Sequence, residues 1–196
     1  MVPPLRAVAF DLMDTVVRDP YREALTAATG RDLDAIAHAR VPGAYHQLEV
    51  GAIDEDAYWA HYVAAGVPID VARFHEVRRA GYAFVTGMDR LLDDLDGLVL
   101  RVAATNYPRW VDELLGGMLV GRFEAAVASI DIRARKPDPV FYARVAAAAG
   151  VEPAEVLVVD DRQVNVDGAL AVGMRAHLFA GAEDLRARLR AEAVPV

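Results

Sequence analysis

Six side chains that can bind anions or metal ions follow short apolar stretches of the chain. They are Asp11, Thr105, Asn106, Lys136, Asp160 and Asp161. Carboxylates held close together repel one another unless a cation lies among them. Oxygen ligands of this kind suit a hard cation, above all Mg²⁺. If these residues meet, the metal ion and the Lys136 ammonium would together bind a small anion.

Two of these residues carry a further signal. Thr105 precedes a predicted helix at 108–115, with Pro108 in its first turn. Its hydroxyl and the N–H groups that follow would then form an anion site at the positive end of the helix dipole. Lys136 is the only lysine among 21 basic residues. Because arginine occupies every other basic position, we infer that a compact ammonium is needed here.

The segments that would position these residues are apolar stretches typical of buried parallel strands. Their ranges are 6–10, 98–104, 125–129, 156–159 and 175–179. Helical patterns lie between and after the last four, at 108–115, 139–149, 165–171 and 183–193. This alternation predicts an α/β fold with an open, doubly wound parallel sheet. Such sheets bind ligands at the carboxyl ends of their strands, where all six side chains are expected.

The stretch between the first two strands is longer than one crossover needs. A strand–helix–strand unit takes about 30 residues, whereas more than 80 residues separate Asp11 from Leu98. Only a helix near 88–95 is required for the crossover. Glycines and capping aspartates delimit further helical patterns at 21–29, 32–40, 42–50, 54–66 and 70–81. We therefore predict an all-helical cap at 17–86, inserted after strand one into a core made of 1–16 and 87–196.

The composition narrows the class of partner. The chain has 196 residues, no cysteine and a formal net charge of −8. The lack of cysteine excludes disulfides, thiolate metal ligands and cysteine nucleophiles. The negative charge argues against nucleic acid, which is bound by clustered Lys and Arg, and no apolar run approaches the ~18 residues that span a bilayer. We expect a small anionic substrate, no membrane association and a cytoplasmic location.

The order of these residues resembles that of the haloacid dehalogenase-like (HAD) hydrolases, in the branch with a helical cap after the first strand. The resemblance covers nearly the whole chain. Phe10-Asp11-x-x-x-Thr15 looks like the first motif of the family, and Thr105 matches the second. Lys136-Pro137 matches the third motif, and Val158-Val159-Asp160-Asp161-x-x-x-Asn165-x-x-Gly168-Ala169 looks like the fourth.

The resemblance implies a Rossmann-like core and a Mg²⁺-dependent phosphohydrolase of small phosphorylated metabolites. Asp11 would be the nucleophile and would form an aspartyl phosphate. Thr105 and Lys136 would be catalytic and, together with Asn106, would bind the substrate. The metal ligands implied are Asp11, the backbone carbonyl of Met13, Asp160 and Asp161.

Met13 departs from the pattern of the family. Phosphatases of the family usually carry a second Asp two residues after the nucleophile. That Asp acts as a general acid toward the leaving group and then as a base toward the attacking water. Loss of a positioned acid–base costs ~10²–10⁴ in rate. The turn geometry is expected to point the adjacent Asp14 elsewhere. The cap histidines are candidate replacements: His38, His46, His61 and His75. Other cap residues that face either the site or the cap interior are Arg22, Tyr45, Trp59 and Tyr62, and cap packing is the expectation for the aromatic ones.

Two alternatives follow from Met13. A 2-haloacid dehalogenase needs no acid, because a halide leaves without a proton. The pair Asp160-Asp161 argues against it, since dehalogenases of this fold work without metal and carry uncharged residues there. A phosphonate-cleaving relative needs a cap lysine, which this chain lacks. The second alternative is a weakly active or non-catalytic scaffold, against which the retained nucleophile, lysine and acidic pair argue.

Overall fold

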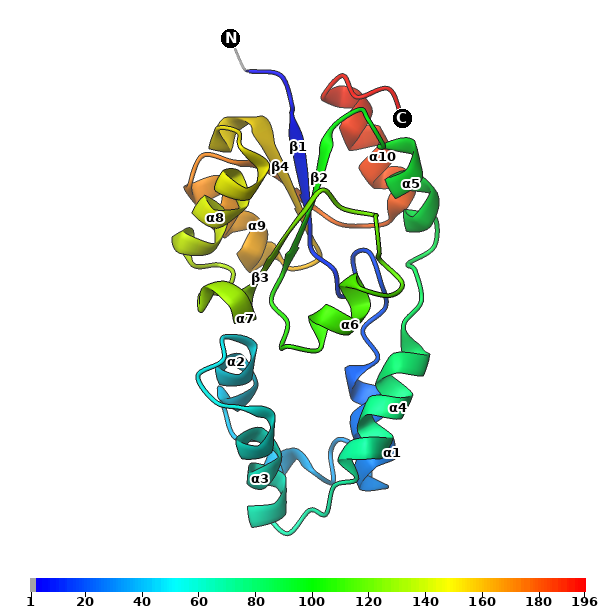
Figure 1. Cartoon of the computed structure of the whole chain (residues 1–196), viewed down its shortest axis with the longest axis vertical. Helices are drawn as coiled ribbons and strands as arrows, with labels where there is room; N and C mark the ends of the chain where they lie inside the picture. The colour runs from blue at the N-terminus through cyan, green and yellow to red at the C-terminus, as the bar shows by residue number, and fades with distance from the viewer. Residues whose placement is uncertain (1–2) are drawn as a thin grey trace.

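Five parallel strands form the centre of the computed structural model, which describes residues 3–196 (Figure 1). The strands are β1 (Ala7–Phe10), β2 (Leu100–Thr105), β3 (Ala125–Ala128), β4 (Val156–Asp160) and β5 (Arg175–Leu178). Their order in the sheet is β3-β2-β1-β4-β5. The order reverses direction at β1, as in a doubly wound sheet. The predicted α/β fold is therefore confirmed.

Helices cover both faces of the sheet and form the inserted segment. The α-helices are α1 (Tyr21–Thr29), α2 (Ala44–Glu49), α3 (Glu55–Ala64), α4 (Val71–Gly81), α5 (Met88–Asp94), α6 (Val111–Leu115), α7 (Ser129–Ile132), α8 (Pro139–Ala149), α9 (Gln163–Ala171) and α10 (Ala182–Ala191). Residues 3–196 also contain two 3₁₀ turns, η1 (Ala37–Ala39) and η2 (Pro153–Glu155).

Alternation along the strands divides the core into two layers. Ala7 and Ala9 of β1 pack in one cluster with residues of α8 and α9. Val8 and Phe10 face the opposite side, in a cluster with residues of α5, α6 and α10. Successive side chains of a strand point to opposite faces, so a strand that is apolar throughout must be covered twice. Figure 1 shows these helices on opposite sides of the sheet.

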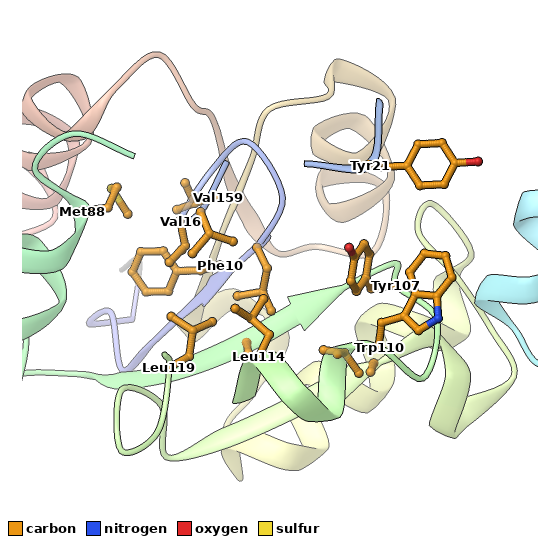
Figure 2. Close-up of a cluster of buried hydrophobic side chains, with 14 of the residues drawn as sticks. Phe10, Val16, Tyr21, Met88, Tyr107, Trp110, Leu114, Leu119 and Val159 are labelled. Carbon is orange, nitrogen blue, oxygen red and sulfur yellow. The ribbon is translucent and has the colours of Figure 1, made fainter. Parts of the chain in front are cut away.

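The larger of the two clusters continues from the core into the inserted segment. Figure 2 shows Phe10 and Val159 of the sheet at one end, with Leu114 and Trp110 further along and Tyr21 of α1 beyond them. Trp110 also contacts aromatic rings of the inserted helices, among them Phe74 at 5.1 Å between ring centroids. Core and cap therefore share one apolar interior.

Two antiparallel linkers connect the cap to the core. The Arg18 N–H donates to the Ala83 carbonyl and the Val85 N–H to the Val16 carbonyl, each over 2.9 Å. Val17 and Phe84 form an isolated antiparallel bridge between these bonds. Helices α1 to α4 all lie between the linkers, with α1 beside α4 (Figure 1). The pairing supports 17–86 as the extent of the cap, which we keep as a proposal.

The helix predicted at 32–40 is wrong, because the structure has turns and the short η1 there. The Ile36 N–H donates to the Leu33 carbonyl and the Ala39 N–H to the Ile36 carbonyl, a spacing of three residues. Such bonds make 3₁₀ rather than α turns. Pro42 lies two residues beyond Arg40 and disfavours helical geometry at the residue before it, so the segment cannot continue as a helix.

Candidate active site

Lys136 is the centre of the site at the carboxyl ends of the strands. Its Nζ donates to Asp11 Oδ1 at 2.8 Å, to Asp160 Oδ2 at 2.6 Å and to the Ala104 carbonyl at 2.6 Å. The side chain is 1% exposed. An ammonium has three donors, and all three are used here. The predicted meeting of residues from β1, β2 and β4 therefore occurs around this one cation.

Asn106 and Asn165 hold Lys136 and Asp160 in place through hydrogen bonds. Asn106 Nδ2 donates to the Lys136 carbonyl at 3.0 Å, and its Oδ1 accepts the Lys136 N–H at 2.8 Å. Asn165 Nδ2 donates to Asp160 Oδ1 at 2.9 Å. That oxygen also accepts the Arg162 N–H at 3.0 Å. Asn106 thus holds the backbone of Lys136, and its side-chain amide retains one N–H for an anion.

The three acidic side chains lie close enough to share a cation. Asp11, Asp160 and Asp161 each offer an oxygen within 4.8 Å of the others. Asp11 and Asp160 are buried, whereas Asp161 is exposed. Three carboxylates against one ammonium leave two negative charges unbalanced. The donor set and this charge fit a hard divalent cation such as Mg²⁺.

Burial and the closeness of these charged groups also shift the pKa values of Asp11 and Lys136. Burial raises the pKa of Asp11; Lys136 opposes the rise, and the charges of Asp160 and Asp161 add to it. Burial alone would lower the pKa of Lys136, but the charges of Asp11 and Asp160 outweigh it and hold the pKa above its ordinary value. The ammonium is therefore kept charged in a buried place, where it binds anionic groups strongly.

Thr105 is the last residue of β2 and follows Ala104, whose carbonyl accepts from Lys136. Its Oγ1 is buried and makes no hydrogen bond within residues 3–196. A buried hydroxyl left unpaired is costly, so a ligand oxygen at this point would satisfy it. The predicted helix dipole behind Thr105 is wrong, because α6 begins only at Val111. The Tyr107 N–H donates instead to Ser129 Oγ at 3.1 Å, which carries the chain away from helical geometry.

Two cavities of the structure share two of their lining residues. The strand-edge cavity, of about 180 Å³, lies over Asp11, Lys136 and Asp161. The cap cavity, of about 460 Å³, is lined by α1, α2, α3 and the turn before α2. Asp19 and Tyr45 line both cavities. These two residues therefore lie at the boundary between the two cavities.

The structure divides the cap residues that the sequence suggested. Tyr45 packs within the cap as expected, with its ring centroid 4.9 Å from that of Tyr21, and it also lines both cavities. Arg22 and Tyr62 line the cap cavity. Trp59 packs within the cap as expected, with its ring centroid 4.8 Å from that of Phe74. Sequence patterns give the face of a helix but not the direction in which a cap docks, so they do not predict that Tyr45 also borders the strand-edge cavity.

The cap histidines lie away from the strand-edge cavity. His46 and His61 line the cap cavity, and His75 Nε2 lies 2.6 Å from Glu55 Oε1. In the part of the chain that the structure describes, none of the cap histidines lines the strand-edge cavity. Two acids that do line it, Asp19 and Glu49, were not predicted from the sequence. The only sequence signal for either acid is that Asp19 precedes Pro20 near the start of a helix, where Asp is a common capping residue.

Met13 and Asp14 form the turn after β1. Met13 is half-buried and lines the strand-edge cavity, where its backbone carbonyl was expected as a metal ligand. Asp14 lines the same cavity and has a φ of 56°, in the left-handed region that Asp tolerates. Its Oδ1 accepts the Asp19 N–H at 3.0 Å. The turn therefore brings Asp19 back toward the strand end.

Polar contacts hold the cap against the core. Arg135 Nε donates to Glu49 Oε2 at 2.8 Å, and Ser129 Oγ donates to the Glu49 carbonyl at 2.7 Å. On the other side, the buried Arg78 of α4 donates to Glu113 Oε2 of α6 at 2.6 Å. Burial raises the pKa of Glu49 to about 7 despite the opposing charge of Arg135. The cap is thus docked over the strand-edge cavity from both sides.

The fold is a doubly wound α/β core with a capped strand edge, and its site is acidic and compatible with a metal ion. The haloacid dehalogenase-like hydrolase family matches residues 5–173. The chain belongs to this family, and it is a HAD-family hydrolase. The non-catalytic alternative is thereby set aside.

The most informative relative is a flavin mononucleotide hydrolase 1 of Arabidopsis thaliana, described as chloroplastic. It is 34% identical over 187 residues, which are 92% of this chain and 75% of the relative. A HAD family enzyme of Bacteroides thetaiotaomicron, crystallised with magnesium and inorganic phosphate, has a TM-score of 0.77 at 18% identity. The match covers 95% of this chain and all of that one (100%).

An L-2-haloacid dehalogenase of Xanthobacter autotrophicus has a TM-score of 0.69 at 22% identity, over 95% of this chain and 82% of that one. At such identities the structural likeness shows the fold alone. Within residues 3–196, every helix is too short or too polar to cross a membrane.

Proposed function

We propose that this hydrolase is a Mg²⁺-dependent phosphohydrolase that acts through an aspartyl phosphate on Asp11. One observation carries the proposal: Lys136 joins Asp11 and Asp160 in a buried cluster with two unbalanced negative charges. A cluster of this charge calls for a divalent cation, and cation and lysine together suit a phosphoryl group. The Mg²⁺-containing Bacteroides structure supports the choice of metal.

Each residue around Lys136 would have a distinct role in phosphoryl transfer. The Lys136 hydrogen bond holds Asp11 Oδ1, which leaves the second oxygen for attack on phosphorus. The Thr105 hydroxyl would hold an oxygen of the phosphoryl group. The Lys136 charge would stabilise that group from behind Asp11, since its three N–H groups are already used. Asn106 keeps Lys136 in place and offers its remaining N–H to the substrate.

The proposed metal ligands belong to the turn after β1, the end of β4 and the turn after β4. Mg²⁺ would be held by Asp11, Asp160, Asp161 and the backbone carbonyl of Met13. When bound, it would supply positive charge that stabilises the transferring phosphoryl group.

The cap cavity supports a substrate with a bulky leaving group. Its volume of about 460 Å³ lies in the range of small-molecule sites, ~300–1,000 Å³. Tyrosine rings and basic side chains line it: Tyr21, Tyr45, Tyr58, Tyr62, Arg22, Arg40, His46 and His61. We propose a small phosphorylated metabolite with an aromatic group. Flavin mononucleotide, the substrate named for the Arabidopsis relative, is the first compound to test.

The test is a panel of phosphoesters, flavin mononucleotide included, assayed with Mg²⁺ and with EDTA. We expect phosphate release that depends on Mg²⁺ and is lost in Asp11→Asn, whose amide is nearly isosteric but a poor nucleophile. Phosphate release that is unaffected by EDTA would refute the metal assignment. The proposed cytoplasmic location is a separate matter, tested by cell fractionation.

Met13 favours a second candidate, hydrolysis of 2-haloacids, because halide departure needs no proton. The unbalanced carboxylates disfavour it, since they repel a carboxylate substrate. The same panel with 2-haloacids separates the two functions. Halide release that persists in EDTA, with no phosphate release from any ester, would establish the dehalogenase.

A further inference from the structure

We propose that Asp19 is the proton donor to the leaving group, in place of the carboxylate that Met13 lacks. The inference rests on the proposed phosphohydrolase function and adds a catalytic residue to it. Asp19 lies in the linker between β1 and α1 and lines both the strand-edge cavity and the cap cavity. With the phosphoryl group in the first cavity and the leaving group in the second, the bond that breaks lies beside Asp19.

The carboxyl group of Asp19 has one oxygen available for a proton. Its Oδ1 accepts the N–H of Tyr21, the first residue of α1, at 3.0 Å. Its own N–H donates to Asp14 Oδ1 at 3.0 Å. These bonds fix the backbone and one oxygen, so Oδ2 is the oxygen that remains to carry and release a proton.

The surroundings of Asp19 favour its protonated form. Burial raises its pKa to about 6. At pH 7 about a tenth of such groups are protonated, against about a thousandth for an ordinary Asp. The charged and titratable groups that face it are Asp14, Arg22, Glu23, Tyr45, Tyr82 and Tyr107. The two acids oppose its ionisation and Arg22 favours it, whereas the tyrosines have raised pKa values and remain neutral.

The other protonatable groups of the strand-edge cavity are less well placed. Arg135 donates to Glu49 Oε2 over 2.8 Å, and Glu49 lines the strand-edge cavity but not the cap cavity. Asp14 is exposed, and its Oδ1 is used by the Asp19 N–H. Burial raises the pKa values of Tyr45 and Tyr107 well above 10, which makes them weak acids. Among the carboxylic acids of residues 3–196, Asp19 alone lines both cavities; Tyr45 also lines both but is a much weaker acid.

The proposed reaction begins with phosphoryl transfer to Asp11 and ends with hydrolysis of the phosphorylated enzyme. An oxygen of Asp11 attacks phosphorus, the bond between phosphorus and the leaving oxygen breaks, and that oxygen takes the Asp19 proton to leave as an alcohol. The Asp19 carboxylate then accepts a proton from water. The water oxygen attacks phosphorus, the Asp11–phosphorus bond breaks, and phosphate and the free Asp11 carboxylate are regenerated.

Asp19→Asn tests this role, because an amide still accepts the Tyr21 N–H but cannot act as an acid. The measurement is the single-turnover rate of enzyme phosphorylation, with saturating Mg²⁺, for glycerol phosphate and p-nitrophenyl phosphate. An alkoxide needs a proton to leave and a nitrophenolate does not. We expect a loss of ~10²–10⁴-fold for glycerol phosphate and less than about tenfold for p-nitrophenyl phosphate. In the wild type, the glycerol phosphate rate should fall as pH rises above about 6, and Asp19→Asn should lack this decline.

Glu49→Gln and Asp14→Asn are the comparison variants, since they remove the other acids of the strand-edge cavity. Neither should reproduce the dependence on the leaving group. If either one does, or if Asp19→Asn slows both substrates equally while its thermal unfolding is unchanged, Asp19 is not the donor. Failure of the proposed function has a different signature: wild-type enzyme that is not phosphorylated even by p-nitrophenyl phosphate. That result would remove both proposals.

Discussion

Lys136 shows how one residue organises the site. Its ammonium reaches three acceptors from three strands, two of them carboxylates and one a backbone carbonyl. Such a position needs a compact cation with donors in three directions. The planar guanidinium of arginine is wider and directs its hydrogen bonds within one plane. The chain has arginine at every other basic position, so the lysine reflects this geometry.

Lys136→Arg should therefore lose ~10²-fold or more in kcat/KM, although it keeps the charge. The reason is displacement of Asp11 and of the positive charge that lies beside it. Steady-state kinetics on the best phosphoester measure the effect. Arg144→Lys is the matched control, a basic exchange on the exposed side of α8, and should leave kcat/KM unchanged. A Lys136→Arg enzyme with wild-type kinetics would make Lys136 a structural residue only.

Sequence order predicted most of the residues that meet at the strand ends. Asp11, Lys136 and Asp160 could be grouped because parallel strands bring their carboxyl ends to one edge. The environment of Thr105 was predicted incorrectly, since the Tyr107–Ser129 hydrogen bond is a contact over 22 residues. Asp19 was missed because its place between two cavities depends on how the cap docks.

Among the secondary-structure elements, α9 fixes the position of the loop that carries Lys136, because it packs closely against that loop. A Cβ on Gly168 would lie 2.7 Å from Pro137 Cβ, 2.9 Å from Tyr142 Oη and 3.1 Å from the Pro137 carbonyl. Glycine is therefore required for α9 to approach the residue that follows Lys136. The capping aspartates Asp54 and Asp70 show the complementary case, where a local signal was sufficient to predict the start of a helix.

Gly168→Ala should push this loop away from α9. We expect a loss of about 1–3 kcal/mol in the free energy of unfolding and a lower kcat, because Lys136 shifts relative to Asp11. Urea unfolding and phosphatase assays measure the two effects. Leu170→Ala, at a position 53% exposed on the same helix, should change stability by less than about 0.5 kcal/mol. Equal behaviour of the two variants would contradict the close packing.

For the whole molecule, the function depends on a cap that stays docked over the strand edge. Arg78 and Arg79 of α4 both donate to Glu113 of α6. The hydrogen bond from Arg79, with that from Arg78, lowers the pKa of Glu113 to about 2. A lowered pKa means that ionised Glu113 stabilises the folded state above its ordinary pKa of 4.5. This contribution is lost as pH falls from 4.5 to about 2.

Glu113→Gln should therefore be less stable than the wild type at pH 7, by about 1 kcal/mol because Glu113 is partly exposed. The difference should disappear between pH 4.5 and about 2. Denaturant unfolding across this range measures it. Glu76→Gln, which removes an exposed pair within α4, should have little effect at any pH. A difference between Glu113→Gln and wild type that does not depend on pH would rule out the ion pair as its cause.

Attack by Asp11 on phosphorus is the central claim, and trapping the phosphorylated enzyme tests it most directly. The enzyme is mixed with its best phosphoester and Mg²⁺, quenched in acid within one turnover, digested and examined by mass spectrometry. We predict one phosphoryl group, on the peptide that contains Asp11, and none in Asp11→Asn or in wild type with EDTA. A phosphoryl group on another residue, or full turnover by Asp11→Asn, would contradict the account.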